Sequence, residues 1–260
     1  MENAKELLDV LKKQTMFIRL PEDNVVFVGD THGDFDASQR VIEKYLKTHT
    51  IVFTGDYVDR GRQSKENMDY LLKTKLENPD KLYLLLGNHE AIPVLGCGIR
   101  DFWDNLEMAD YRLKEYGKYA SVLPKLPLAA YRKGVLAVHG VPPDVKKLDD
   151  IASVKIRSKV WEHTIWGDFN ECEGDYLERN FSGSSSISGR PQFGRDYFNR
   201  VMKQLGCKKL IRSHQPDSPL KMFNDRCITI FTSTAYLGRR PSRTIIVADL
   251  DKQKYKIEKI

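Results

Sequence analysis

Apolar positions in the first third of the chain first follow a helical period and then form compact runs. Spacings of three and four residues predict an amphipathic helix, whereas short uninterrupted apolar runs predict buried strands. The predicted elements are a helix over residues 3–14, strands over 25–28, 51–54 and 82–86, and helices over 36–47 and 64–77 between the strands. Strands that alternate with helices are typical of a largely parallel sheet with helical crossovers.

The remainder of the chain has a different pattern. A helical stretch at about 101–120 is followed by short apolar segments with polar turns, which predict a mixed second sheet. The predicted strands are 128–131, 135–139, 227–231, 244–248 and 254–258. The Gly/Ser-rich segment Ser182–Ser188 predicts a mobile surface loop inside the domain rather than a domain boundary. We therefore expect a single domain over residues 1–260, with residues 1–20 as an N-terminal helical extension.

Composition narrows the classes of function. The 260 residues are 41% hydrophobic and 30% charged, as in ordinary globular proteins, and no apolar run reaches the roughly 18 residues that a membrane span needs. The net charge of +6 favours an anionic partner such as a phosphorylated substrate. Basic residues form no run of five or more, so we expect neither nucleic-acid binding nor membrane attachment. The N-terminus lacks a secretion signal, which predicts a cytoplasmic protein.

Polar motifs follow each of the three predicted parallel strands. They read Gly29-Asp30-Thr31-His32-Gly33, Gly55-Asp56-Tyr57-Val58-Asp59-Arg60-Gly61 and Gly87-Asn88-His89-Glu90. Functional groups collect beyond the carboxyl ends of parallel strands, so these motifs should converge. Their imidazole nitrogen and carboxylate and amide oxygens form the donor set for divalent transition metals. Asp30 and His32 can chelate one ion, and a carboxylate such as Asp56 can bridge two ions about 3.5–4 Å apart.

The three motifs resemble the signature blocks GDxHG, GDYVDRG and GNHE of the phosphoprotein phosphatase family of metallophosphatases. The resemblance covers about residues 24–248. Val138-His139-Gly140 is similar to the fourth block of the family, Arg212-Ser213-His214-Gln215 to the fifth, and Phe231–Gly238 to a late loop that carries a tyrosine. The resemblance implies an α/β calcineurin-like metallophosphatase fold, with two mixed β-sheets packed as a sandwich and flanked by helices.

The resemblance also implies two divalent metal ions and a metal-activated water that hydrolyses phosphoserine or phosphothreonine in phosphoprotein substrates. Manganese is the first expectation, and iron, zinc or cobalt also suit these ligands. Asp30, His32 and Asp56 would bind the first ion, and Asp56, Asn88, His139 and His214 the second. Arg60, Arg190 and Tyr236 would bind the substrate phosphate. His89, oriented by Asp59, would protonate the leaving oxygen.

The sequence departs from the family pattern at several positions. Arg190 lies in a shortened segment, Ser188–Gly194, and the late loop lacks the Pro-Asn-Tyr-Cys sequence of eukaryotic members. Asp34 stands where eukaryotic members usually have glutamine. These departures indicate a prokaryotic, archaeal-like member. Two other functions stay open: a nucleotide phosphoesterase such as a diadenosine tetraphosphate hydrolase, and a catalytically silent scaffold that binds phosphopeptides or partner proteins. Regulatory subunits and the native metals are not identified by the sequence.

Overall fold

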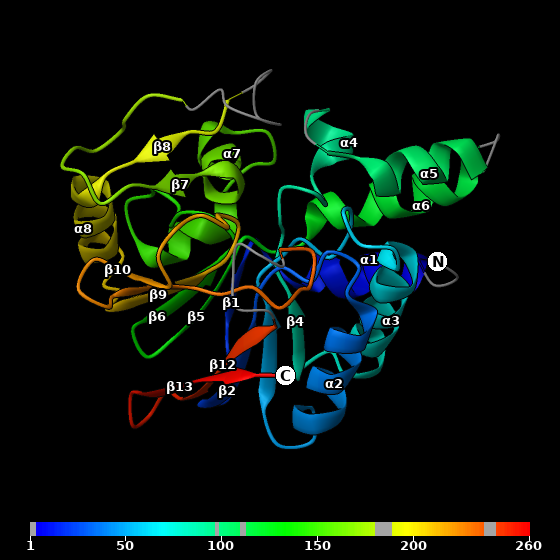
Figure 1. Ribbon diagram of the computed structural model, residues 1–260, viewed down its shortest axis with the longest axis horizontal. Coiled ribbons are helices and arrows are strands. Elements are labelled where there is room, and N and C mark those ends of the chain that lie inside the picture. The colour runs from blue at the N-terminus through cyan, green and yellow to red at the C-terminus, as the bar shows by residue number, and fades with distance from the viewer. Residues whose placement is uncertain (1–3, 97–98, 110–112, 180–188, 237–242) are drawn as a thin grey trace.

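Two β-sheets face each other and helices cover their outer faces (Figure 1). The computed structural model describes residues 4–96, 99–109, 113–179, 189–236 and 243–260. The predicted loop Ser182–Ser188 lies outside these residues. Within the described ranges, no helix combines the length and the apolar character that crossing a bilayer requires.

The elements follow the sequence pattern closely in the first half of the chain. The helices are α1 (Ala4–Lys13), α2 (Phe35–Tyr45), α3 (Ser64–Glu77), α4 (Ile92–Leu95), α5 (Asp101–Ala109), α6 (Lys114–Val122), α7 (Lys159–Trp166) and α8 (Arg195–Gln204), with 3-10 helices η1 (Leu123–Lys125) and η2 (Leu148–Ser153). The strands are β1 (Phe17–Arg19), β2 (Asn24–Val28), β3 (Thr50–Phe53), β4 (Leu82–Leu84), β5 (Ala129–Arg132), β6 (Val135–Val138), β7 (Asp168–Phe169), β8 (Gln192–Phe193), β9 (Lys209–Arg212), β10 (Lys221–Met222), β11 (Cys227–Thr229), β12 (Thr244–Asp249) and β13 (Lys254–Lys259).

The five-stranded sheet has the order β13-β12-β2-β3-β4. Its strands β2, β3 and β4 are parallel, and the register pairs Val28 with Phe53 and Phe53 with Leu84. The carboxyl ends of these three strands therefore lie level with one another. The chain segments that follow them leave the sheet side by side, as the sequence predicts.

The six-stranded sheet has the order β1-β5-β6-β9-β11-β10. Strands β6 and β9 are parallel neighbours, although more than 60 residues separate them in the sequence. Ser213, just past β9, donates its backbone N–H to the carbonyl of His139, just past β6, at 3.1 Å. This pairing places the fourth and fifth motifs side by side, beyond the carboxyl ends of β6 and β9.

Three apolar clusters hold the layers together. The cluster between the sheets contains Val25 and Phe27 of one sheet and Ile211 of the other. Val26 and Val28 alternate with Val25 and Phe27 along β2. Their side chains point to the opposite face of the five-stranded sheet and pack in the cluster under the helices. The third cluster joins the outer face of the six-stranded sheet to α8. The alternation of buried side chains along β2 thus places one apolar surface in each layer.

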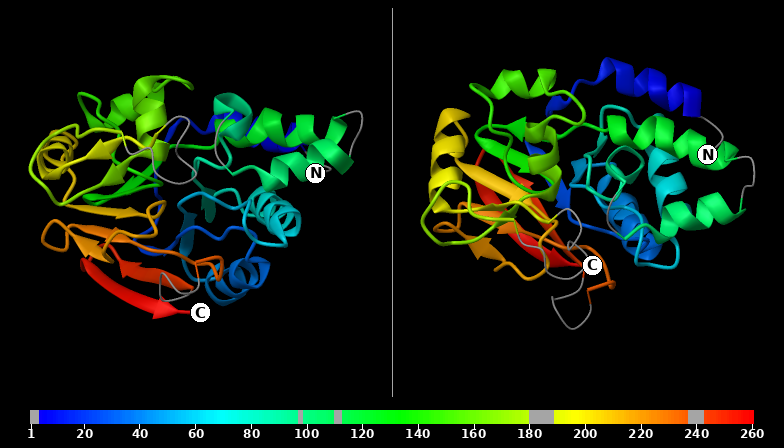
Figure 2. Two further views of the ribbon diagram at one scale, coloured as in Figure 1. Left: turned by 45° about the horizontal axis from the view of Figure 1, so that its top comes forward. Right: turned by 90° about the horizontal axis from the view of Figure 1, so that it is seen from above.

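The description of residues 1–20 as a helical extension is wrong in part. Helix α1 ends at Lys13, and Phe17–Arg19 form β1, which pairs in parallel with β5 at the edge of the six-stranded sheet. Leu7 and Leu11 of α1 are buried in the core, and α1 lies beside α6 (Figure 2). A three-residue strand is too short for a periodic signal, so its pairing depends on β5, about 110 residues later.

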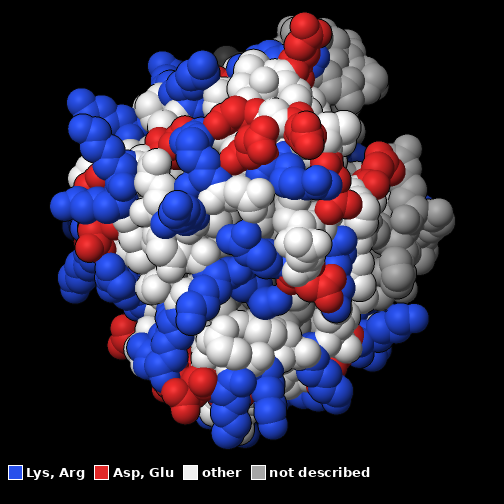
Figure 3. Space-filling model, turned by 90° about the vertical axis from the view of Figure 1, so that its left-hand side faces the viewer, with Lys and Arg blue, Asp and Glu red and all other residues white. Residues whose placement is uncertain are grey.

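Basic side chains are prominent on the face that carries α8. Lysine and arginine side chains outnumber acidic ones on this face (Figure 3). Helix α8 itself contributes Arg195, Arg200 and Lys203. The net positive charge of the chain is therefore displayed in part on the outer side of the six-stranded sheet.

Candidate metal and phosphate site

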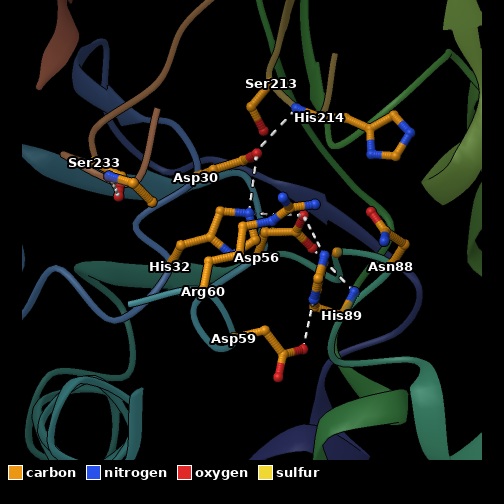
Figure 4. Close-up of polar contacts among 12 residues, drawn as sticks. Asp30, His32, Asp56, Asp59, Arg60, Asn88, His89, Ser213, His214 and Ser233 are labelled. Atoms are coloured by element: carbon orange, nitrogen blue, oxygen red, sulfur yellow. Dashed lines mark hydrogen bonds and ion pairs between the residues drawn. The ribbon is translucent and has the colours of Figure 1, made fainter. Parts of the chain in front are cut away.

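Side chains from the ends of both sheets converge at one place in the fold (Figure 4). His32, Asp56 and His214 each follow a strand and have positive φ angles of 42°, 56° and 70°. Non-glycine residues rarely adopt this conformation, which concentrates at functional sites. The neighbouring loops also approach closely, because a Cβ atom at Gly87 would lie 2.3 Å from the backbone nitrogen of Asp56. Glycine at that position is therefore required by space.

Asp30, His32 and Asp56 form the first group of candidate ligands. Nδ1 of His32 donates to the carbonyl of Val58 at 2.7 Å, which leaves the lone pair of Nε2 directed at the site. Nε2 lies 3.7 Å from Oδ2 of Asp30 and 3.6 Å from Oδ2 of Asp56. A backbone carbonyl that fixes the outer ring nitrogen is the usual support of a metal-binding histidine.

Asp56, Asn88, His139 and His214 form the second group. Nε2 of His139 lies 3.3 Å from Oδ2 of Asp56, 3.0 Å from Oδ1 of Asn88 and 3.1 Å from Nδ1 of His214. The other ring nitrogen of His139 donates to the carbonyl of Thr54 at 2.9 Å. Asp56 thus faces both groups, as a bridging carboxylate must.

The buried charges of the site fit a pair of cations. Asp30 and Asp56 are at most 2% exposed. Burial raises the pKa of Asp30 to about 6, and the neighbouring charge of Asp56 acts in the same direction. Burial also opposes ionisation of Asp56, but the facing histidines, His139 first, hold the pKa of that carboxyl well below its usual range. Two buried carboxylates with converging imidazole nitrogens and an amide oxygen match the donors that divalent transition metals bind.

His89 and Asp59 lie beside the ligand cluster. Nδ1 of His89 is 2.5 Å from Oδ2 of Asp59, and Nε2 of His89 is 3.9 Å from Oδ2 of Asp56. Burial alone would lower the pKa of His89, but the charges of Asp56 and Asp59 and the hydrogen bond to Asp59 outweigh it and raise the pKa. The raised pKa favours the imidazolium form of His89, in which Nδ1–H donates to Asp59 and Nε2 carries a second proton on the side of the site.

The predicted phosphate ligands surround the same hollow. The hollow is lined by Asp56, Arg60, Asn88, His89, Ile99, Trp166, Arg190, His214, Pro216 and Tyr236. The Arg60 guanidinium lies 5.5 Å from the ring centre of Tyr236. The Tyr236 hydroxyl is 2.8 Å from Nε2 of His32 and 3.4 Å from Oδ2 of Asp30. The Arg190 guanidinium contacts Nε2 of His214 and donates to Oδ1 of Asp168 at 2.8 Å. All eleven residues that the sequence marks as site residues are thus described, and all lie in or beside this one cluster.

Comparison with known proteins shows which family the chain belongs to. The family model described as calcineurin-like phosphoesterase matches residues 24–218, three quarters of the chain. The chain belongs to that family. The family prediction made from the strand-end motifs is therefore confirmed, and the matched segment includes every candidate ligand from Asp30 to His214.

A curated protein and a solved structure, both described as serine/threonine phosphatases, are similar to the chain. A probable serine/threonine-protein phosphatase of Encephalitozoon cuniculi is 27% identical over 236 residues, which are 86% of this chain and 50% of the relative. The chain thus spans about half the length of this curated relative. A solved serine/threonine phosphatase of Saccharomyces cerevisiae with similarity to human phosphatase PP5 has a TM-score of 0.78 at 23% identity, covering 98% of this chain and 87% of its own.

Two further solved structures share the fold at lower sequence identity. A cold-active protein-tyrosine phosphatase of a Shewanella species gives a TM-score of 0.59 at 15% identity, over 96% of this chain and 84% of its own. A structure described as a putative diadenosine tetraphosphatase gives 0.51 at 16% identity, over 94% and 97%. The predicted fold, two mixed sheets packed as a sandwich with flanking helices, is confirmed by the family match and these structures.

Sequence reasoning missed several residues that support the candidate site. Glu90 is fully buried and accepts the backbone N–H groups of Asp56, Tyr57 and Gly87 at 2.8–3.1 Å. Glu90 is the last residue of the third motif, and this position could have marked it as a site residue. Trp103 donates its indole N–H to the carbonyl of His89 at 2.9 Å.

Helix α5 supports the catalytic candidates from its first turn. Phe102 donates its backbone N–H to Oδ1 of Asp59 at 2.7 Å, and Asp101 accepts the backbone N–H of Arg60 at 3.0 Å. No periodic pattern or motif in the sequence indicates these contacts, because α5 meets the second motif more than 40 residues away. Asp168, the partner of Arg190, likewise has no local signal.

Proposed function

We propose that this chain is a metal-dependent serine/threonine protein phosphatase, which hydrolyses phosphoserine and phosphothreonine monoesters in proteins. The observation that carries the proposal is one cluster of six candidate metal ligands, three of which line a hollow together with Arg60 and His89, the partner of Asp59. The names of the relatives from Encephalitozoon cuniculi and Saccharomyces cerevisiae support the choice of substrate. We also propose a cytoplasmic location and soluble phosphoproteins as partners, without nucleic acid or membrane.

The two groups of side chains would hold two divalent ions. Asp30, His32 and Asp56 are the proposed ligands of one, and Asp56, Asn88, His139 and His214 those of the other. When bound, such ions activate a water molecule as the nucleophile near neutral pH and neutralise charge on the phosphoryl group. Manganese is the proposed ion, because carboxylate, amide and imidazole ligands suit it, although they also admit iron, zinc and cobalt.

The remaining residues bind the substrate and move a proton. Arg60 and Arg190 present guanidinium groups at the hollow, and this planar fork matches two phosphoryl oxygens. The Tyr236 hydroxyl lies at the same hollow as a further donor. Nε2 of His89 faces this space and gives its proton to the serine or threonine oxygen as the ester bond breaks, while Asp59 holds the other ring nitrogen.

Hydrolysis of a nucleotide ester is the closest competing function, because the same ligands would serve it. The chain shares a fold with a structure described as a putative diadenosine tetraphosphatase. The intact second and third motifs and the tyrosine of the late loop favour a protein substrate. A catalytically silent scaffold is disfavoured, since all six ligand side chains are present and face one another.

A substrate panel tests the proposal. The purified chain is stripped of metal with a chelator, reloaded with manganese, iron, cobalt or zinc in turn, and assayed on five substrates. These are a phosphoserine, a phosphothreonine and a phosphotyrosine peptide, diadenosine tetraphosphate and p-nitrophenyl phosphate. We expect the highest kcat/KM on phosphothreonine or phosphoserine peptides. A higher value on diadenosine tetraphosphate would assign the competing function, and no turnover with two metals bound would indicate the scaffold.

A further inference from the structure

Asp34 is a buried carboxylate two residues beyond the candidate ligand His32, and both of its oxygens are saturated with donors. Its side chain is 5% exposed. Oδ1 accepts the backbone N–H of Ala37 at 3.2 Å and so caps the N-terminus of α2. Oδ2 accepts the backbone N–H of Thr234 at 2.9 Å. One carboxylate therefore ties the first metal motif to a segment 200 residues later.

Arg243 completes the set of donors to Asp34. Its Nε lies 3.0 Å from Oδ2 and a terminal nitrogen lies 2.8 Å from Oδ1. The guanidinium therefore donates two parallel hydrogen bonds to the carboxylate. The Arg243 side chain is 21% exposed, and its other terminal nitrogen contacts Asp36. Bidentate pairs of this kind are among the strongest hydrogen-bonded contacts in proteins, and partial burial reduces their screening by solvent.

The two residues that meet at Asp34 bracket Tyr236. Thr234 lies two residues before the tyrosine and Arg243 lies seven residues after it. Strand β11 of the six-stranded sheet ends at Thr229, and β12 of the five-stranded sheet begins at Thr244, whose backbone N–H donates to the carbonyl of Phe231 at 2.7 Å. Asp34 thus contacts one residue on each side of Tyr236, whose hydroxyl is 2.8 Å from Nε2 of His32.

We propose that Asp34 and Arg243 form a clasp that positions Tyr236 over the metal and phosphate site. This proposal deepens the proposed phosphatase function and rests on it. Asp34 is a positioning residue, because it touches neither the hollow nor the candidate ligands' reactive atoms and acts through the loop it holds. The clasp therefore affects substrate binding, because it keeps the Tyr236 hydroxyl at the position where the substrate phosphate would bind.

The clasp requires a carboxylate. An amide of the same shape keeps one acceptor, which suffices to cap α2, because asparagine caps helices as well as aspartate does. Its NH2 group, however, would take the place of Oδ2 and could accept neither the backbone N–H of Thr234 nor Nε of Arg243, so only one of the two hydrogen bonds from Arg243 would remain. Asp34→Asn should therefore release the loop while leaving the helix and the metal motif folded.

The test compares Asp34→Asn and Arg243→Gln with Asp36→Asn, the matched control. Asp36 also contacts Arg243, but its side chain is 50% exposed and no described bond joins it to Thr234 or Tyr236. Assays use the metal-loaded chain, a phosphothreonine peptide and p-nitrophenyl phosphate, with metal content and melting temperature measured for every variant. We expect Asp34→Asn and Arg243→Gln to raise KM and the inhibition constant of inorganic phosphate by about tenfold, since displacing a binding group by about 1 Å can have effects of that size or larger. Asp36→Asn should stay within twofold of wild type with full metal content.

A double-mutant cycle with Tyr236→Phe separates positioning from a merely structural role. If Asp34 acts through the Tyr236 hydroxyl, Asp34→Asn should change KM by less than twofold once that hydroxyl is removed. Additive effects, or wild-type KM in both clasp variants, would overturn the proposal. If Asp34→Asn does not fold, the same cycle with the partly exposed Arg243→Gln decides it. Failure of the proposed function is distinct, because the wild-type chain itself would then not hydrolyse the phosphopeptide.

Discussion

Nδ1 of His89 lies 2.5 Å from Oδ2 of Asp59, and neither side chain is more than 4% exposed. The second oxygen of Asp59 accepts the backbone N–H of Phe102 at 2.7 Å, so the carboxylate cannot rotate away from the imidazole without losing that bond. Trp103 holds the backbone of His89 from the same helix. Helix α5 thus holds both residues, and Nε2 of His89 is the ring nitrogen left without a partner in Asp59, on the side of the hollow.

The first prediction concerns the leaving group. A serine or threonine alkoxide needs a proton to depart, whereas p-nitrophenolate is a weak base and leaves almost unaided. General acid catalysis contributes about 10²–10⁴-fold. We expect His89→Asn to slow phosphopeptide hydrolysis by roughly that factor and p-nitrophenyl phosphate hydrolysis clearly less, with both metals retained. Asp59→Asn should show the same asymmetry in weaker form.

The ratio of the two losses is the measurement that decides the role of His89. Equal slowing of both substrates at full metal occupancy would assign His89 to phosphate binding or water positioning. Metal content is measured alongside, because His89, His32 and Asp56 bring possible ligand atoms within 4.8 Å of one another. Loss of one metal in His89→Asn would make His89 a ligand instead of an acid.

The second prediction concerns phosphate binding by Arg60. Its side chain is exposed and its guanidinium lies over the ring of Tyr236 at the hollow. We expect Arg60→Ala to weaken the affinities for substrate and for inorganic phosphate together, by about 10-fold or more, because a charge-assisted bidentate contact is lost. Both affinities are read from steady-state kinetics with phosphate as inhibitor.

Arg62→Ala is the control for Arg60, since Arg62 is also exposed but does not line the hollow. It changes the net charge by the same amount and should leave both affinities within about twofold. Similar losses of affinity in the two variants would mean that Arg60 acts only by long-range attraction of the anionic substrate. Unchanged affinities in Arg60→Ala would transfer the role to Arg190.

The third prediction concerns metal content. Oδ2 of Asp56 lies 3.6 Å from Nε2 of His32 and 3.3 Å from Nε2 of His139, the ring nitrogens left free to bind metal, so both groups of candidate ligands share this carboxylate. We expect Asp56→Asn to lower the bound metal from two ions toward one or none and to abolish turnover. Metal analysis after gel filtration measures it. Two ions with near-normal turnover would contradict the bridging assignment.

The fourth prediction concerns stability below neutral pH. The His163 ring is stacked on Tyr176 and meets Phe193 edge-on, and burial, aided by the charge of Lys159, lowers its pKa to about 4. Between that value and the unfolded pKa of about 6.5, the unfolded chain binds the proton and the folded chain does not. His163 therefore contributes a loss of stability as the pH falls from about 6.5 toward 4.

Urea denaturation at pH 7.5 and pH 5 measures this loss. We expect the midpoint of the wild-type chain to fall more between the two pH values than that of His163→Gln, which cannot take up a proton. Other carboxylates titrate in both chains, so only the difference between them reports on His163. Equal falls would mean that the folded chain protonates His163 as readily as the unfolded chain does.

The sequence by itself determined the fold of the first half and the candidate ligands of the first three motifs. The reason is local: compact apolar runs define β2, β3 and β4, and each carries its ligands in the residues directly after it. Parallel pairing of three such strands leaves one place for those residues to meet. His139 and His214 needed the resemblance to a known family, because nothing local relates β6 to β9 before the sheet forms.

Only the tertiary structure decided how these side chains are held. The hydrogen bond from Trp103 to His89, the pairing of Arg190 with Asp168 and the grip of Arg243 on Asp34 join residues 14, 22 and 209 positions apart. Strand β1 is likewise defined by a partner far along the chain. Such contacts produce no period in the sequence, since each depends on one side chain reaching one distant group. Burial then fixes them, because a polar group withdrawn from water must find its partner inside the fold.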